Sequence, residues 1–179
     1  MRLINVFTGP MKSGKTTKLI NKYIDLSENT KYKCMMFKPL IDNRFSETEV
    51  VSREGNKIMS ININTIYDLL PYKDLTDIFF IDEFQFIEGQ DIYMILNSFI
   101  DSGKKFYIAG LNLTSERKPF NSMAQILALA DNVEYLKAKC DKCGKPAIYT
   151  YCKNRKDSDI LIGNDEYLSL CHNCYKEMK

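Results

Sequence analysis

Residues 3–16 read LINVFTGPMKSGKT, an apolar run that leads into a loop with a glycine near each end. The run over residues 3–8 predicts a short buried strand, and apolar residues at helical spacing predict a helix over residues 15–28. The loop between them fits the pattern G-x-x-x-x-G-K-[ST], which requires a strand before it and a helix after it. This context argues against the alternative, an ordinary glycine-containing turn.

Each position of this loop has a chemical reason. Gly9 and Gly14 let backbone N–H groups turn toward phosphate oxygens, and the helix N-terminus adds the positive end of its dipole. We expect Lys15 to reach the β and γ phosphates, and the Thr16 hydroxyl to ligate Mg²⁺. The loop is therefore predicted to bind ATP with Mg²⁺ through Gly9, Pro10, Met11, Lys12, Ser13, Gly14, Lys15 and Thr16.

Strands and helices are predicted to alternate along residues 1–138. A short helix capped by Asn64 should end before Pro71. This alternation indicates an α/β fold with a mostly parallel sheet covered on both faces. Strands are expected over residues 32–38, 78–81, 106–111 and 133–136, helices over 92–100 and 123–130, and a loop or hairpin over 40–60.

The strand over residues 78–81 runs into Asp82 and Glu83. Asp82 is expected to hold Mg²⁺, directly or through water. Glu83 has two possible roles, because a carboxylate there could polarise water in an ATPase or accept a proton from an acceptor hydroxyl in a kinase. The pattern alone leaves both open.

The cysteines indicate a second, smaller domain over residues 139–179. Two C-x-x-C pairs are separated by 27 residues, and four thiolates complete a tetrahedron around a structural Zn²⁺. Free thiols or disulfides are the alternative. The predicted ligands are Cys140, Cys143, Cys171 and Cys174, whereas His172 is expected at the surface, Cys34 in the core, and Cys152 as a spare thiol.

Composition excludes some classes of protein. The 179 residues carry a net charge of +2, which argues against a protein that coats nucleic acid. No apolar run is long enough to cross a membrane, and residues 1–6 lack the apolar segment of a secretory signal. We therefore expect a cytoplasmic protein with no membrane and no nucleic-acid partner.

Further short motifs along the chain indicate a particular class of P-loop protein. In this order the chain carries DNRF from residue 42, SREG from 52, DEFQF from 82, AGL from 109, RKPF from 117 and GNDEY from 163. These motifs and the loop at residues 9–16 resemble those of the cytosolic, zinc-containing type II thymidine kinases, and they cover nearly the whole chain. The resemblance implies a RecA-like P-loop sheet flanked by helices, with a small zinc ribbon that carries a lasso-like loop.

The resemblance also implies a reaction. The γ-phosphate of ATP passes to the 5′-hydroxyl of thymidine, with deoxyuridine as a second candidate substrate and Glu83 as general base. Lys15 and Arg44 would assist catalysis, while Asp42, Arg44, Asp82 and Gln85 would contact the nucleotide. It further implies a homotetramer and feedback inhibition by dTTP.

Thymine would lie under the loop between the cysteine pairs, whose backbone groups can match its acceptor-donor-acceptor edge. The apolar candidates fit a plain core equally well. The residues implied in substrate binding are Met11, Phe86, Leu111, Ser115, Phe120, Thr150, Ser158, Asp159, Ile160, Leu161, Ile162 and Tyr167.

The sequence departs from the family at Asn112, Ser115 and Ile162, where an Asp, an aromatic residue and a Gly are usual. These changes put base selectivity in question and leave the phosphoryl-transfer residues in place. Two alternatives stay open: a pyrimidine deoxynucleoside kinase of shifted preference, and a P-loop ATPase whose zinc ribbon binds nucleic acid.

Overall fold

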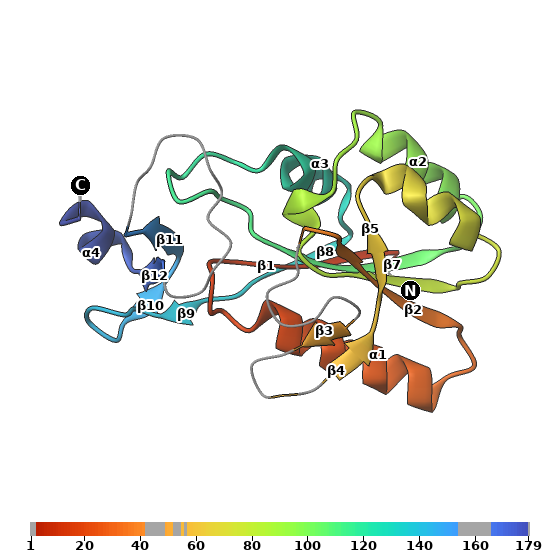
Figure 1. Cartoon of the computed structure of the whole chain (residues 1–179), viewed down its shortest axis with the longest axis horizontal. Coiled ribbons are helices and arrows are strands. Elements are labelled where there is room, and N and C mark those ends of the chain that lie inside the picture. Colours follow the sequence, from red (N-terminus) through yellow and green to blue (C-terminus); the bar gives the residue numbers. More distant parts are fainter. Residues whose placement is uncertain (1–2, 42–48, 52–54, 56, 154–165, 179) are drawn as a thin grey trace.

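A computed structural model describes residues 3–41, 49–51, 55, 57–153 and 166–178 (Figure 1). Its main element is a six-stranded sheet with the order β5-β2-β6-β7-β1-β8, in which every neighbouring pair is parallel. The α/β class predicted from the sequence is therefore confirmed. The strands are β1 (Ile4–Thr8), β2 (Cys34–Pro39), β5 (Ile61–Ile63), β6 (Ile78–Ile81), β7 (Lys105–Gly110) and β8 (Asn132–Tyr135).

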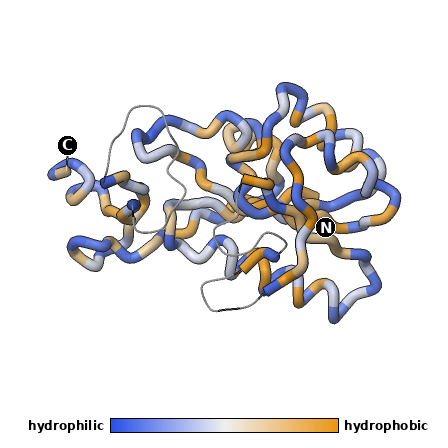
Figure 2. The backbone as a smooth tube through the Cα atoms, in the orientation of Figure 1, coloured by the Kyte–Doolittle hydropathy of each residue, from blue (hydrophilic) through white to orange (hydrophobic). Residues whose placement is uncertain are grey.

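Both faces of the sheet are covered by helices. Along β6, Ile78 and Phe80 point to one face, and Phe79 and Ile81 to the other, so all four are buried. Helix α1 (Lys15–Asn29) packs on the first face, and α2 (Ile92–Ile100) and α3 (Asn121–Leu129) pack on the second (Figure 1). Figure 2 shows the hydrophobic segments gathered where the strands cross the middle of the molecule.

Several predicted elements differ from the structure. Strand β5, which the sequence prediction missed, pairs with β2 at the sheet edge. By contrast, the predicted loop or hairpin over residues 40–60 is confirmed in its described part, where β3 (Glu49–Val51) and β4 (Lys57–Met59) pair antiparallel. Cys34, expected in the core, is only half-buried at the start of β2.

The helix predicted after Asn64 is a 3-10 helix, η1 (Ile66–Tyr72). Its cap is Thr65 and not Asn64, and the Asp68 carboxylate accepts hydrogen bonds from the N–H groups of both residues. The predicted end before Pro71 is also wrong. The helix continues through Pro71, whose ring removes one N–H donor, and Lys73 N–H still donates to Leu70 O at 3.2 Å.

The C-terminal part has its own small core, built around Ala147, Leu170 and Tyr175. Two short hairpins and a helix form it (Figure 1, blue). The domain boundary between residues 138 and 139 stays a prediction. These elements are β9 (Ala138–Lys139), β10 (Pro146–Ala147), β11 (Tyr149–Cys152), β12 (Tyr167–Leu170) and α4 (His172–Lys176).

Within the described part of the chain, no helix combines the length and the apolar character needed to cross a bilayer.

Candidate active site

The predicted nucleotide residues gather at one edge of the sheet. Strands β1, β6 and β7 are parallel neighbours, so their carboxyl ends meet there. The loop over residues 9–14 follows β1, Asp82 and Glu83 follow β6, and Leu111 follows β7. This is the edge at which parallel α/β sheets bind their ligands.

The backbone of the loop needs its glycines. Gly9 has φ +150° and Gly14, the cap of α1, has φ +84°, and Lys12 also lies in the left-handed region at +62°. Lys15 is buried, and its Nζ donates to Pro10 O at 2.8 Å. The buried Ser13 hydroxyl has no hydrogen-bond partner among the described residues, an orphaned polar atom that fits a site built for a polar ligand.

The backbone of Gly9 lies too close to Leu136 for any side chain, because a Cβ at Gly9 would lie 2.2 Å from Leu136 O. We expect Gly9→Ala to lower the free energy of unfolding by about 2–4 kcal/mol through this clash and the strained φ. Urea denaturation of both proteins measures the difference. Gly103→Ala is the matched control, because its φ is also positive (+77°) but nothing lies within 4 Å of its Cβ. Equal losses in the two variants would contradict the close approach.

Thr16 and Asp82 meet across the edge. The Thr16 hydroxyl donates to Asp82 Oδ2 at 2.9 Å, although 66 residues separate them. Asp82 is almost fully buried. A hydroxyl and a carboxylate side by side are oxygen ligands of the type that Mg²⁺ prefers, so this pair fits the ion.

Glu83 lies beside this pair in an unusual backbone conformation. Its φ and ψ of 48° and 41° are left-handed, which costs energy for a residue with a side chain. Gln85 Nε2 donates to the Glu83 carboxylate, and Gln85 Oε1 accepts from Leu111 N at 2.9 Å. The buried Ser122 hydroxyl lies 3.2 Å from Phe84 O and Gln85 O, which fixes the short helix η2 (Phe84–Phe86). Gln85 thus holds the Glu83 carboxylate and is itself held by Leu111, the residue after β7.

The four predicted zinc ligands form a cluster in which all sulfur atoms lie within 4.8 Å of one another. The Cys143 and Cys171 sulfurs are 3.6 Å apart, close to the roughly 3.8 Å of two sulfurs around a tetrahedral zinc. The four cysteines therefore fit a zinc ion. His172 is exposed, as predicted, and Cys152 is buried in β11.

The four sulfurs of the cluster differ in how readily they ionise. Burial opposes ionisation of Cys140, but N–H groups of Cys171, Cys143 and Lys142 donate to its sulfur and lower its pKa to about 6. The Cys143 sulfur, together with burial, raises the pKa of Cys174 to about 12. Four crowded sulfurs cannot all carry charge by themselves, which is the arrangement that a divalent cation relieves.

The predicted substrate residues are only partly described. Phe86 and Phe120 contact each other edge to face, with ring centroids 6.2 Å apart. Thr150 is buried, and Leu111, Ser115 and Tyr167 are half-buried. Asp42, Arg44 and the loop residues Ser158, Asp159, Ile160, Leu161 and Ile162 lie outside the described residues.

Three contacting residues were missed by the sequence prediction. Ser169 and Asp141 bond to the loop over residues 9–14, and the Tyr175 hydroxyl donates to Ser115 O at 2.6 Å. The motifs gave no signal for them, because each contact joins residues at least 60 positions apart.

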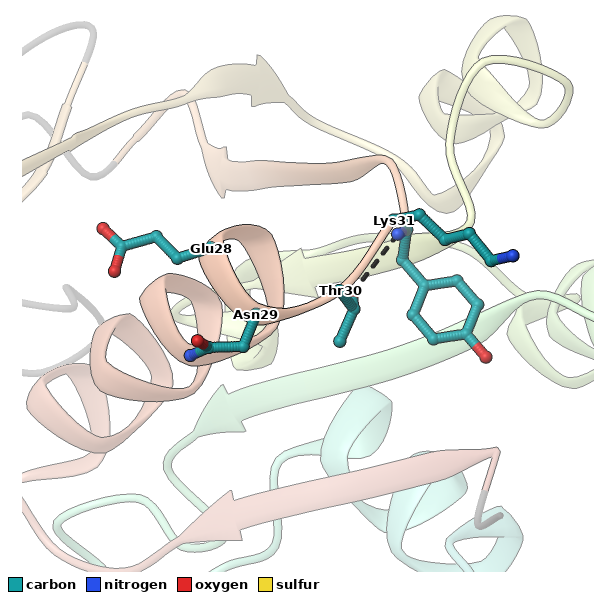
Figure 3. Close-up of a pocket in the computed structure, with 5 residues that line it drawn as sticks. Glu28, Asn29, Thr30 and Lys31 are labelled. Carbon is teal, nitrogen blue, oxygen red and sulfur yellow. Dashed lines mark hydrogen bonds between the residues drawn. The ribbon is translucent and has the colours of Figure 1, made fainter.

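A surface pocket lies elsewhere (Figure 3). It is lined by Glu28, Asn29, Thr30, Lys31 and Tyr32, at the C-terminal end of α1. The site loop precedes the other end of this helix of 15 residues, roughly 20 Å away at 1.5 Å per residue. The pocket therefore does not belong to the site.

A parallel sheet with a glycine-containing loop and a helix N-terminus at its carboxyl edge is typical of α/β proteins that bind nucleotides. The comparisons with known proteins agree with this class. A family model described as thymidine kinase matches residues 2–175. The chain therefore belongs to the thymidine kinase family and is a kinase, which confirms the resemblance found in the sequence.

Individual relatives give the same result. The thymidine kinase of Mesomycoplasma hyopneumoniae (strain 7448) is 37% identical over 176 residues, which cover 97% of this chain and 95% of that protein. That of Pseudothermotoga lettingae is 33% identical, covering 98% of this chain and 95% of the relative. The thymidine kinase of Choristoneura biennis entomopoxvirus is also 33% identical, covering 97% and 96%.

Proposed function

We propose that the protein transfers the γ-phosphate of ATP to the 5′-hydroxyl of thymidine, giving dTMP. One observation carries this proposal. The loop over residues 9–14, called the glycine loop below, lies at the same edge of the sheet as the Thr16–Asp82 pair and Glu83. Membership of the thymidine kinase family supports the choice of acceptor.

In this proposal the residues divide the work. Backbone N–H groups within residues 12–16 and the N-terminus of α1 bind the phosphates, and Lys15 exchanges its bond to Pro10 O for a phosphate oxygen. Thr16 and Asp82 would hold Mg²⁺, which neutralises charge on the β and γ phosphates. Glu83 accepts the proton of the 5′-hydroxyl as that oxygen attacks phosphorus. Arg44 and Asp42 are proposed to contact ATP from the family motif alone.

The remaining site assignments are proposals too. Zinc is structural, because four cysteines leave no open coordination position. Thymine lies under the loop over residues 158–162 against Met11, Phe86, Leu111 and Phe120. We further propose, from family membership, a cytoplasmic homotetramer inhibited by dTTP, with no membrane and no nucleic-acid partner.

A competition assay tests the choice of base. With Mg-ATP, we expect thymidine to be phosphorylated fastest, deoxyuridine next and deoxycytidine slowest. Equal rates for the three would favour the kinase of shifted preference, which the departure at Ser115 suggests. Hydrolysis of ATP that DNA or RNA stimulates would instead favour the ATPase alternative.

A further inference from the structure

The hairpin of β11 and β12 forms hydrogen bonds to the backbone of the glycine loop at one residue, Met11. The Met11 N–H donates to the Thr150 hydroxyl at 3.0 Å, and the Ser169 hydroxyl donates to Met11 O at 2.6 Å. Thr150 and Ser169 face each other across the hairpin as partners in register. Both are buried, with exposed fractions of 5% and 0%. Two opposed hydroxyls therefore hold the backbone donor and acceptor of a single loop residue.

A second contact, through Asp141, joins the same hairpin to the glycine loop. Asp141 Oδ2 accepts a hydrogen bond from Ser169 N at 2.6 Å and also from Lys12 Nζ at 2.9 Å. Lys12, the next loop residue, has the left-handed φ of +62°. The bond from Lys12 Nζ ties the side chain of this strained residue to Asp141, so one carboxylate joins the hairpin to the loop.

These contacts act on the conformation of the loop. The hydroxyls occupy the peptide groups of Met11, which leaves the N–H groups of the following residues to face phosphates. A loop that must present several N–H groups at once binds an anion well only when its backbone is fixed in advance. Bonds across 139 and 158 residues of sequence can fix it where the local sequence cannot.

We propose that Thr150 and Ser169 are positioning residues that hold the phosphate-binding loop in its ATP-binding conformation. The small cysteine domain would then serve the ATP site directly, besides covering the nucleoside. This inference rests on the proposed function, because it assumes that the loop binds ATP.

The test measures the Kd for Mg-ATP by calorimetry without nucleoside, at a temperature where every variant is folded. We expect Ser169→Ala and Thr150→Val each to weaken binding about tenfold, since each leaves a buried backbone group unpaired. Thr150→Ser keeps the hydroxyl and should restore binding. Thr76→Val is the control, because it removes a buried hydroxyl that contacts Met35 at the opposite end of β6. It should leave the Kd unchanged.

The outcomes separate this inference from the proposed function. Wild-type protein that binds Mg-ATP, with unchanged Kd values in both hydroxyl variants, would overturn the positioning role and leave the proposed function intact. Wild-type protein that does not bind Mg-ATP would overturn both. Hydrogen exchange on the wild type tests the inference without any variant. The Met11 amide should exchange as slowly as the amides of β1, and fast exchange would overturn the positioning role of Thr150.

Discussion

Replacement of Glu83 by glutamine is expected to lower kcat by about 10²–10⁴-fold, the usual contribution of a general base. Glutamine has the same shape but cannot accept the proton of the 5′-hydroxyl. The Thr16–Asp82 pair and the glycine loop are unchanged, so the Kd for Mg-ATP should stay within about twofold. Single-turnover kinetics with bound ATP and saturating thymidine measure the chemical step.

A matched variant controls for the loss of charge. Glu88 is exposed, five residues further along the chain, and Glu88→Gln makes the same chemical change. It should leave kcat unchanged. If Glu83→Gln keeps a rate near that of the wild type, Glu83 is not the base, and its left-handed backbone and its bond from Gln85 need another explanation.

Removal of one zinc ligand is expected to have the second large effect, on zinc content and on the folding of the small C-terminal core. Cys140→Ser takes away the sulfur whose pKa is lowered to about 6 and leaves three ligands. Metal binding to structural zinc sites has apparent free energies of about 10–16 kcal/mol in zinc-finger peptides, so most of the folding energy of so small a core is at stake. We expect the variant to lose its zinc, and the backbone amides of β9 to β12 and α4 to lose protection from hydrogen exchange. Zinc analysis after dialysis measures the first effect.

Cys34→Ser provides the control, because this half-buried thiol lies in β2, outside the cluster. The control and the wild type should each retain one zinc per chain. Wild-type protein purified without zinc, or a Cys140→Ser variant with full zinc content, would contradict the structural assignment. Loss of zinc should also weaken ATP binding, because the hairpin that holds Met11 belongs to the same small core.

The sequence predicted those parts of the fold whose chemistry is local. The glycine loop lies between β1 and α1 as expected, because the apolar run, the two glycines and the helical spacing all lie within 30 residues. The C-x-x-C spacing likewise predicted which four sulfurs come together. Strand β5 was missed because three residues at a sheet edge carry too little pattern.

The contacts between distant segments could not be predicted. The bond of Ser169 to Met11 depends on how the hairpin docks on the sheet, and a serine in a strand has no pattern that reveals a partner 158 residues away. The bond from Leu111 N–H to Gln85 Oε1 similarly depends on β6 and β7 being neighbours. The functional residues within short motifs could therefore be predicted from the sequence. The contacts that position those motifs relative to one another could be found only in the structure.

The most direct test of the central assignment is to incubate the purified protein with Mg-ATP and thymidine and to follow the products by ³¹P NMR. We expect one dTMP for each ADP formed, and no product when Mg²⁺ is chelated. Release of inorganic phosphate in step with ADP, without dTMP, would contradict it, because Glu83 would then be activating water and not the 5′-hydroxyl of thymidine.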